Sequence, residues 1–151
     1  MGAEEGHMIE LKRRPDWREH YEAAIDEITA TPFQWGIHDC GPSLAGRIVK
    51  AITGADLCAE YHGTYSDALG AARIIREAGF TSLAEMVGSM LPQAHPSEAC
   101  IGDIAAIEAD GPIGCGLGVV NGERIYVLTE TGIGTVDLLE AKMIFKVGRP
   151  E

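Results

Sequence analysis

Histidine is missing from the last third of this chain. Five histidines occur among 151 residues, and none of them follows His95. An imidazole is the usual general base for a cysteine nucleophile. Chemistry of that kind would therefore have to draw its histidine from the first 95 residues.

Basic residues are also scarce. The chain has 12 lysines and arginines against 23 aspartates and glutamates, so its formal net charge is −11. Such a charge repels the phosphate backbone of nucleic acid, and we expect no nucleic-acid partner. The acidity favours solubility, and it also suits a basic partner protein or a positively charged polymer.

Cysteine pairs and long apolar runs are absent. The four cysteines, Cys40, Cys58, Cys100 and Cys115, form no CxxC pair, which argues against a disulfide framework and a zinc site of the usual spacing. We expect reduced thiols and no metal or other cofactor; a metal or cluster on Cys40, Cys100 and Cys115 is the alternative. Because no apolar run suits a transmembrane helix or a signal peptide, we expect no membrane span and synthesis in a cytoplasm.

Composition indicates one globular domain. Hydrophobic residues make up 46% and charged residues 23% of the chain, a balance typical of a soluble globular protein. A chain of 151 residues is long enough to bury a core in a single domain. We expect a mobile N-terminal arm over residues 1–14 and one domain over residues 15–151.

Four helices are predicted in the first part of the chain. Each combines apolar residues at helical spacing with a proline, glycine or capping residue where a helix starts or stops. The first begins near Pro15–Asp16 and ends before Pro32, and the second runs from Cys40 to about Thr53, ended by Gly54. The third is capped by Ser66 and stopped by Gly79, and the fourth opens with a capping box at Ser82–Glu85 and is closed by Pro92.

Short β-rich segments follow a loop that is predicted from Pro92 to Cys100. They are Ile104–Ile107, Gly116–Val120, Arg124–Leu128, Gly134–Val136 and Ile144–Val147. Asn121-Gly122 predicts a hairpin with a type I′ turn between the second and third of them. Because helices come first and strands second, the sequence favours an α+β fold, with the helices packed on a five-stranded antiparallel sheet.

The segment from Phe33 to Pro42 carries the clearest chemical signal. Its aromatic-rich turn places Cys40 in the first turn of a predicted helix, directly after Asp39, which is suited to cap that helix. Free backbone N–H groups and the positive end of the helix dipole favour a thiolate at this position. Cys40 is therefore the candidate nucleophile.

Three features in series resemble the NlpC-type cell-wall peptidases, in a layout similar to the small phage-encoded branch of that family. They are Trp35-Gly36-x-x-Asp39-Cys40 at a helix start, Gly102-Asp103 at the first strand, and the glycine-rich hairpin. The resemblance spans about residues 31–147 and implies a papain-like fold. It also implies cleavage of amide bonds in peptidoglycan stem peptides, with Cys40 as the nucleophile and a histidine on the second strand as the base.

The position that aligns with the family's histidine is Gly116. Without an imidazolium to protonate the leaving amine, amide cleavage stalls at the tetrahedral intermediate. We therefore expect weak or absent peptidase activity. The candidate binding residues are Trp35, Asp39 and Gly116, of which Trp35 is expected mainly to hold the turn in place. Asp103 is expected to be a structural turn residue.

Two displaced histidines are candidate replacements for the missing base: His38, two residues before Cys40, and His95, in the loop ahead of the first predicted strand. The resemblance implies a module at a phage tail tip. The leading hypothesis is a weakly active or inactive tail protein, made in the host cytoplasm and incorporated into the virion, with its acidic surface on tail-hub proteins. The alternative is an active peptidoglycan amidase or endopeptidase that uses Cys40 with His95 or His38.

Overall fold

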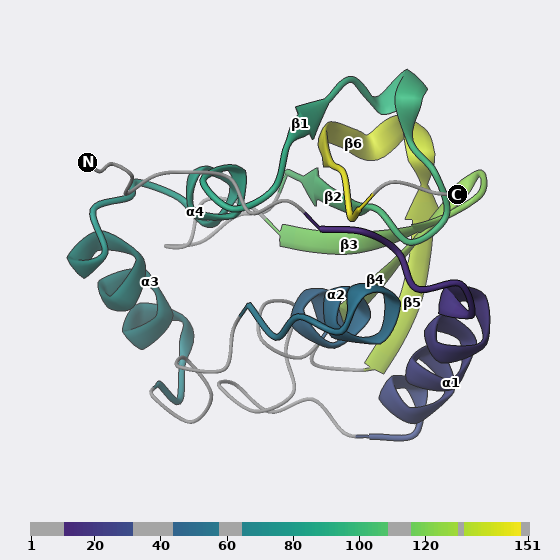
Figure 1. Ribbon diagram of the computed structural model, residues 1–151. Coiled ribbons are helices and arrows are strands. Elements are labelled where there is room, and N and C mark those ends of the chain that lie inside the picture. Colours follow the sequence, from purple (N-terminus) through teal and green to yellow (C-terminus); the bar gives the residue numbers. More distant parts are fainter. Residues whose placement is uncertain (1–10, 32–43, 58–64, 109–115, 130–131, 149–151) are drawn as a thin grey trace.

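The fold joins helices to one antiparallel sheet. The computed structural model describes residues 11–31, 44–57, 65–108, 116–129 and 132–148 (Figure 1). Within these residues, four α-helices and a six-stranded antiparallel sheet form an α+β fold. The predicted fold class is confirmed at this level.

The four helices lie within the segments predicted to be helical. α1 spans Trp17–Thr29, α2 spans Gly46–Thr53, α3 spans Ala68–Glu77 and α4 spans Leu83–Gly88. α2 ends at Gly54, whose φ of 89° is left-handed, as predicted. The predicted start of this helix at Cys40 lies outside the described residues.

The predicted N-terminal cap is correct for α4 but not for α3. The prediction of Ser66 was wrong, because α3 is capped by Asp67, whose carboxylate accepts a hydrogen bond from the Gly70 N–H at 2.7 Å. The negative charge of an aspartate also suits the positive end of a helix. α4 is capped by Ser82 as predicted, and the Ser82 hydroxyl accepts from the Glu85 N–H at 3.1 Å. The Glu85 carboxylate accepts from the Thr81 N–H at 2.6 Å, one residue before the position that the predicted capping box requires.

The sheet has the strand order β1-β6-β2-β3-β4-β5. Its strands are β1 Gln93–Ala94, β2 Ile104–Ile107, β3 Gly116–Asn121, β4 Arg124–Thr129, β5 Gly132–Asp137 and β6 Ala141–Phe145. The prediction of five strands was wrong, because β1 pairs with β6 and adds a sixth. Two residues are too few to show the alternation that identifies a strand.

The hairpin between β3 and β4 is confirmed, but its turn type is not the predicted one. Asn121 pairs with Arg124, so the two turn residues are Gly122 and Glu123. Of these two residues, Gly122 has a positive φ of 73°, whereas Glu123 does not, since every described residue with a positive φ is a glycine. A type I′ turn needs positive φ at both positions, whereas a type II′ turn needs it at the first alone. The geometry therefore fits type II′.

Both faces of the sheet are covered by apolar residues. Ile104, Leu117 and Val119 join residues of α1 and α2 in the larger apolar cluster. Their neighbours along the strands, Ala105 and Val120, point the other way and belong to a second, smaller cluster. This alternation is the two-residue period of a β-strand, and it places α1 and α2 on one face of the sheet.

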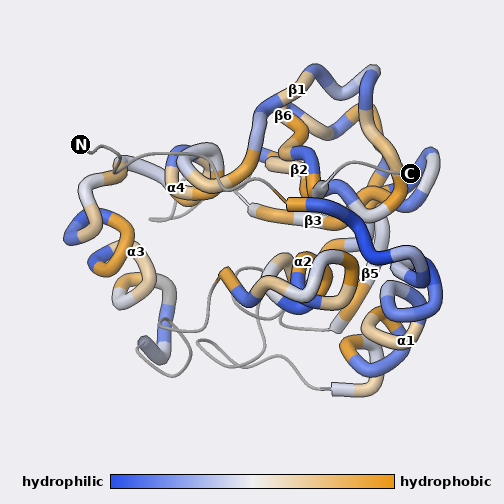
Figure 2. The backbone as a smooth tube through the Cα atoms, in the orientation of Figure 1, coloured by the Kyte–Doolittle hydropathy of each residue, from blue (hydrophilic) through white to orange (hydrophobic). Residues whose placement is uncertain are grey.

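The packed chain begins before the predicted domain boundary at residue 15. Leu11 packs against the larger apolar cluster, and Arg13 is only 3% exposed. The Arg14 N–H donates to the Ile52 carbonyl at 2.8 Å, which fixes this segment to the end of α2. It is the strongly hydrophilic stretch directly before α1 in Figure 2. Residues 11–14 therefore belong to the domain, and residues 1–10 of the predicted arm lie outside the described residues.

Candidate functional site

α2 is the helix whose start is predicted to carry the nucleophile. Four of the predicted site residues precede its described part and lie outside the described residues: Trp35, His38, Asp39 and Cys40. The first described residues of this segment, Leu44 and Ala45, are both buried in the larger apolar cluster. The chain is therefore anchored to the core from Leu44, four residues beyond the predicted nucleophile in the sequence.

The other end of α2 lies where β2 begins. A methyl group placed on Gly102 would come within 2.6 Å of Ile52 Cδ1. The Gly102 N–H in turn donates to the Val120 carbonyl, close to the end of β3. In Figure 1, α2 lies below β3, and β3 begins on the side of the view away from α1. The beginning of α2 is thus directed to the side of the sheet where β3 starts.

Gly116 is the first residue of β3 and pairs with Ile107 at the end of β2. It is half-buried. With no side chain, it can supply neither a base nor a proton donor beyond its own backbone. The strand position that was predicted, from the resemblance to NlpC-type peptidases, to match their histidine therefore offers no side chain for proton transfer. Cys115 lies outside the described residues.

His95 lies at the edge of the sheet, directly after β1. Its Nδ1 accepts a hydrogen bond from the Ser97 N–H at 3.0 Å and contacts the Ser97 hydroxyl at 2.9 Å, which caps the short 3-10 helix Pro96–Glu98. An Nδ1 that accepts from an N–H leaves the proton of a neutral ring on Nε2. In this arrangement the Nδ1 lone pair is engaged by Ser97 of the same loop.

The structure does not bring His95 and Gly116 together. The register aligns Ala94, Ile144, Ala105 and Gly118 across four neighbouring strands, β1, β6, β2 and β3. Three strand spacings of roughly 4.8 Å separate β1 from β3 by about 14 Å along the sheet. A direct replacement of the β3 base by His95 would therefore require a different arrangement of the loop that holds it.

A buried carboxylate marks the opposite end of β2. Asp103 is completely buried, and each of its oxygens accepts two hydrogen bonds. Oδ1 accepts from Arg13 Nη2 at 3.1 Å and from the Val147 N–H at 3.0 Å. Oδ2 accepts from Lys146 Nζ at 2.6 Å and from the Cys100 N–H at 2.8 Å. These contacts fit the predicted role of Asp103 as a structural turn residue.

Arg13 is the residue of this cluster that the sequence did not reveal. Its guanidinium donates to the Val147 carbonyl at 2.9 Å and to the Ile101 carbonyl at 2.7 Å. Its Cζ also lies 4.4 Å from the centre of the Trp17 ring, a cation–π contact. The segment Lys12–Arg14 has the composition of an exposed arm, and its partners are far away in the sequence, so no local signal identifies Arg13.

Lys146 is held as a cation in the same cluster. Burial, the largest single influence, lowers the pKa of its ammonium group, but the hydrogen bond and charge of Asp103 and the contact with Cys100 raise it above its ordinary value of 10.5 overall. The ammonium also donates to the Glu98 carbonyl at 2.8 Å. Lys146 is therefore positively charged at neutral pH and cannot act as a base there.

A second polar contact joins α1 to the hairpin. The Tyr21 hydroxyl donates to Asn121 Oδ1 at 3.0 Å. Burial of the Tyr21 ring, together with the nearby Tyr126, raises the pKa of the Tyr21 phenol well above its ordinary range. This phenol therefore stays protonated at neutral pH and orders the hairpin rather than taking part in proton transfer.

Two further observations concern clustered metal-ligating side chains and the length of the helices. In the part of the chain that the structure describes, no group of three His, Cys, Asp or Glu side chains is placed to hold a metal ion. The described helices also include none with the length and apolar character that crossing a membrane would take.

These elements define an α+β domain built on an antiparallel sheet. The chain belongs to the family described as a domain of unknown function, DUF6950, whose model matches residues 12–147. No curated protein matches the chain. The matched region begins beside Arg13 and ends at Val147, two residues that are directly hydrogen-bonded to each other.

Proposed function

We propose that this protein is an NlpC-type papain-like module that has kept the nucleophile position, Cys40, and lost its base. In this proposal it serves as a hub-associated component of a phage tail tip, with weak or no peptidase activity. The observation that carries the proposal is Gly116 at the first position of β3, where the resemblance calls for a histidine.

The arrangement of elements supports the papain-like fold as the finer assignment. Helices precede the sheet, and α2 packs by its apolar side on the face of β2 and β3. The Gly102-Asp103 turn opens β2, and a glycine-containing hairpin follows β3. This is the order of elements that the resemblance implies, with a nucleophile at the start of the packed helix and a base on the adjacent strand.

Surface charge supports a basic protein partner, which we take to be a tail-hub protein. α1 exposes four carboxylates, Glu19, Glu22, Asp26 and Glu27, and the whole chain carries a net charge of −11. Opposite charges speed association and orient the partners. The proposed location is the virion, and the proposed substrate of any residual activity is a peptidoglycan peptide.

Restoring the base tests the proposal directly. Peptide release from purified peptidoglycan would be measured by mass spectrometry for the wild type and for Gly116→His. Since a positioned general base contributes about 10²–10⁴-fold, we expect the histidine variant to exceed the wild type at least tenfold. The gain should vanish in the double variant with Cys40→Ser, and Gly116→Asn, similar in size but not basic, should show no gain.

The active-enzyme alternative gives the opposite pattern. Strong cleavage by the wild type that is lost in His95→Ala or His38→Ala would support a displaced base and overturn the proposal of a degenerate site. The tail location is tested separately, by searching purified virions for peptides of this protein. Absence of the protein from virions of a phage that expresses it would contradict the proposed assembly role.

A further inference from the structure

β5 forms one edge of the sheet. It is last in the strand order and pairs with β4 along its whole length. The Leu138 N–H, directly after β5, donates to the Glu123 carbonyl on the side of β4. Backbone groups alternate between the two sides of a strand, so those of Ile133 and Thr135 point away from β4. Among the described residues, no other strand lies on that side.

β5 has few of the features that protect an edge strand from further pairing. Charged side chains, prolines and bulges are the usual ones. None of them occurs in residues 132–136, and the register with β4 is unbroken. Arg124 reaches across from β4, and its Nη2 donates to the Thr135 carbonyl at 3.1 Å and to the Thr135 hydroxyl at 3.0 Å. A carbonyl oxygen has two lone pairs, so this contact leaves room for a donor from an added strand.

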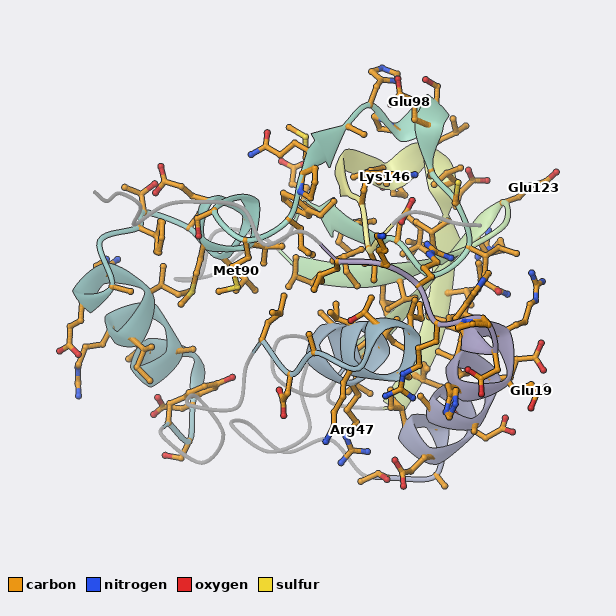
Figure 3. All side chains as sticks on the ribbon, in the orientation of Figure 1. Glu19, Arg47, Met90, Glu98, Glu123 and Lys146 are labelled. Carbon is orange, nitrogen blue, oxygen red and sulfur yellow. The ribbon has the colours of Figure 1, made fainter. Side chains whose placement is uncertain are left out.

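The two faces of the sheet differ beside this edge. Ile133 packs against the larger apolar cluster, on the side of α1, whereas Val136 and Val127 pack against the smaller cluster on the other face. α2 packs where β2 begins, and α1 lies alongside β5 (Figure 1). The flank of α1 that faces away from α2 therefore lies toward the outer edge of β5. Glu19 of α1 and Glu123 of the hairpin turn are on the same side of the view as β5 in Figure 3.

That flank of α1 is acidic. Glu27 marks the opposite flank, because its carboxylate lies 3.3 Å from Arg47 of α2. At about 100° per residue, Glu22 lies about 140° and Asp26 about 100° around the helix from Glu27, and both side chains are exposed. Arg18, 3.9 Å from Glu22, offsets part of this charge. The outer edge of β5 is thus bordered by negative charge on the α1 face and by apolar side chains on the other face.

We propose that the outer edge of β5 binds an extended basic segment of a partner protein, which pairs with Ile133 and Thr135 as an added strand. This inference rests on the basic partner in the proposed function, and it names the chemistry and the place of binding. Main-chain hydrogen bonds hold the segment, and alternate side chains select it. Because side chains alternate between the faces of a strand, lysine or arginine on the α1 face alternates with apolar residues beside Val136. A second copy of the chain fits less well, since each copy carries a net charge of −11.

Peptide binding tests this edge. The full-length protein would be titrated by fluorescence anisotropy with a labelled peptide in which lysine and valine alternate. The control peptide has the same composition, with its lysines first and its valines last, and we expect it to bind more weakly. Thr135→Pro removes an outward N–H that the ladder to β4 does not use, and it should weaken binding about tenfold. Thr135→Val keeps that N–H and should stay within about threefold of the wild type. Glu22→Gln combined with Asp26→Asn should weaken binding about two- to tenfold.

Hydrogen exchange in the wild type locates the peptide. On binding, the amides of Ile133 and Thr135 should exchange more slowly, whereas those of Gly134 and Val136, which already face β4, should change little. Equal affinity for the two peptides, or protection without this alternation, overturns the proposal even if Thr135→Pro does not fold. Protection of the same two amides in a dimer of the free protein also overturns it, because a second copy then occupies the edge. Absence of the protein from virions contradicts the tail role alone, so the two failures are distinguishable.

Discussion

Among the carboxylates that the structure describes, Asp103 is the buried one, and we expect the removal of its charge to destabilise the fold most. Asp103→Asn keeps the size of the side chain, but either orientation of the amide turns its NH₂ group toward two donors. Those donors are Arg13 and the Val147 N–H on one side, and Lys146 and the Cys100 N–H on the other. The substitution also leaves the Arg13 guanidinium, with a side chain 1% exposed, without its counter-ion.

The size of the effect follows from this burial. Breaking a buried ion pair by removing one partner costs about 3–5 kcal/mol. For a chain of this length each kcal/mol shifts the melting temperature by about 2–4 °C, so we expect a decrease of roughly 6–20 °C. Urea denaturation followed by circular dichroism would measure the change in the free energy of unfolding. The matched control is Asp26→Asn, which removes an exposed carboxylate from α1 and should stay within about 0.5 kcal/mol of the wild type.

A small effect would refute the account of this cluster. If Asp103→Asn lowered the free energy of unfolding by less than about 1 kcal/mol, the two cations would have to be solvated or paired elsewhere. A large loss in Asp26→Asn would be equally damaging, because it would indicate that net charge rather than the buried pair governs stability.

Three further predictions concern the same fold. The pKa of Lys146 is raised on folding. Its contribution to stability is therefore complete below about pH 10.5 and declines as the pH rises through the pKa of Lys146 in the folded protein. Urea midpoints measured across that range should decline, and the decline should be smaller in Lys146→Met. Tyr21→Phe removes the hydrogen bond to Asn121 and should lower the free energy of unfolding by about 1 kcal/mol, and no measurable change would contradict the role of this contact. Gly102→Ala should destabilise the fold by about 1–3 kcal/mol more than Gly79→Ala. Both glycines have φ near 95°, but only a methyl group on Gly102 would meet Ile52. Equal losses in the two variants would argue against the close packing of α2 on β2.

Local signals identified most of the secondary structure. The apolar spacing of Tyr21, Ile25 and Ile28 predicts α1, and these residues are its buried face. Pairing between distant segments explains what was missed. β1 exists because Gln93 and Ala94 pair with β6, and the turn type of the hairpin follows from the pairing of Asn121 with Arg124. No local sequence pattern predicts either pairing.

The candidate site was predictable to a different degree. Alignment on the glycine-rich hairpin predicts that Gly116 stands where the resemblance expects a histidine, and Gly116 does begin β3 as predicted. The capping role of His95 depends on Ser97, two residues away, and on the loop geometry that aligns them. The positions of Trp35, His38, Asp39 and Cys40 lie outside the described residues, so the proposed nucleophile remains a prediction from sequence.

The Asp103 cluster also explains where this domain begins and ends. One carboxylate joins Arg13, the turn Cys100–Asp103 and the segment Lys146–Val147, which are separated by up to 134 residues. Because the side chain and backbone partners of Asp103 come from both ends of the chain, a fragment that lacks either end leaves a buried charge without its donors. The family match over residues 12–147 has nearly the same limits.

A fragment starting at residue 15, the boundary that composition suggests, should therefore be less stable than one starting at residue 11 by an amount comparable to the loss of Arg13, about 3–5 kcal/mol. Equal urea midpoints for the two fragments would show that the N-terminal segment is dispensable and that the domain closes without it.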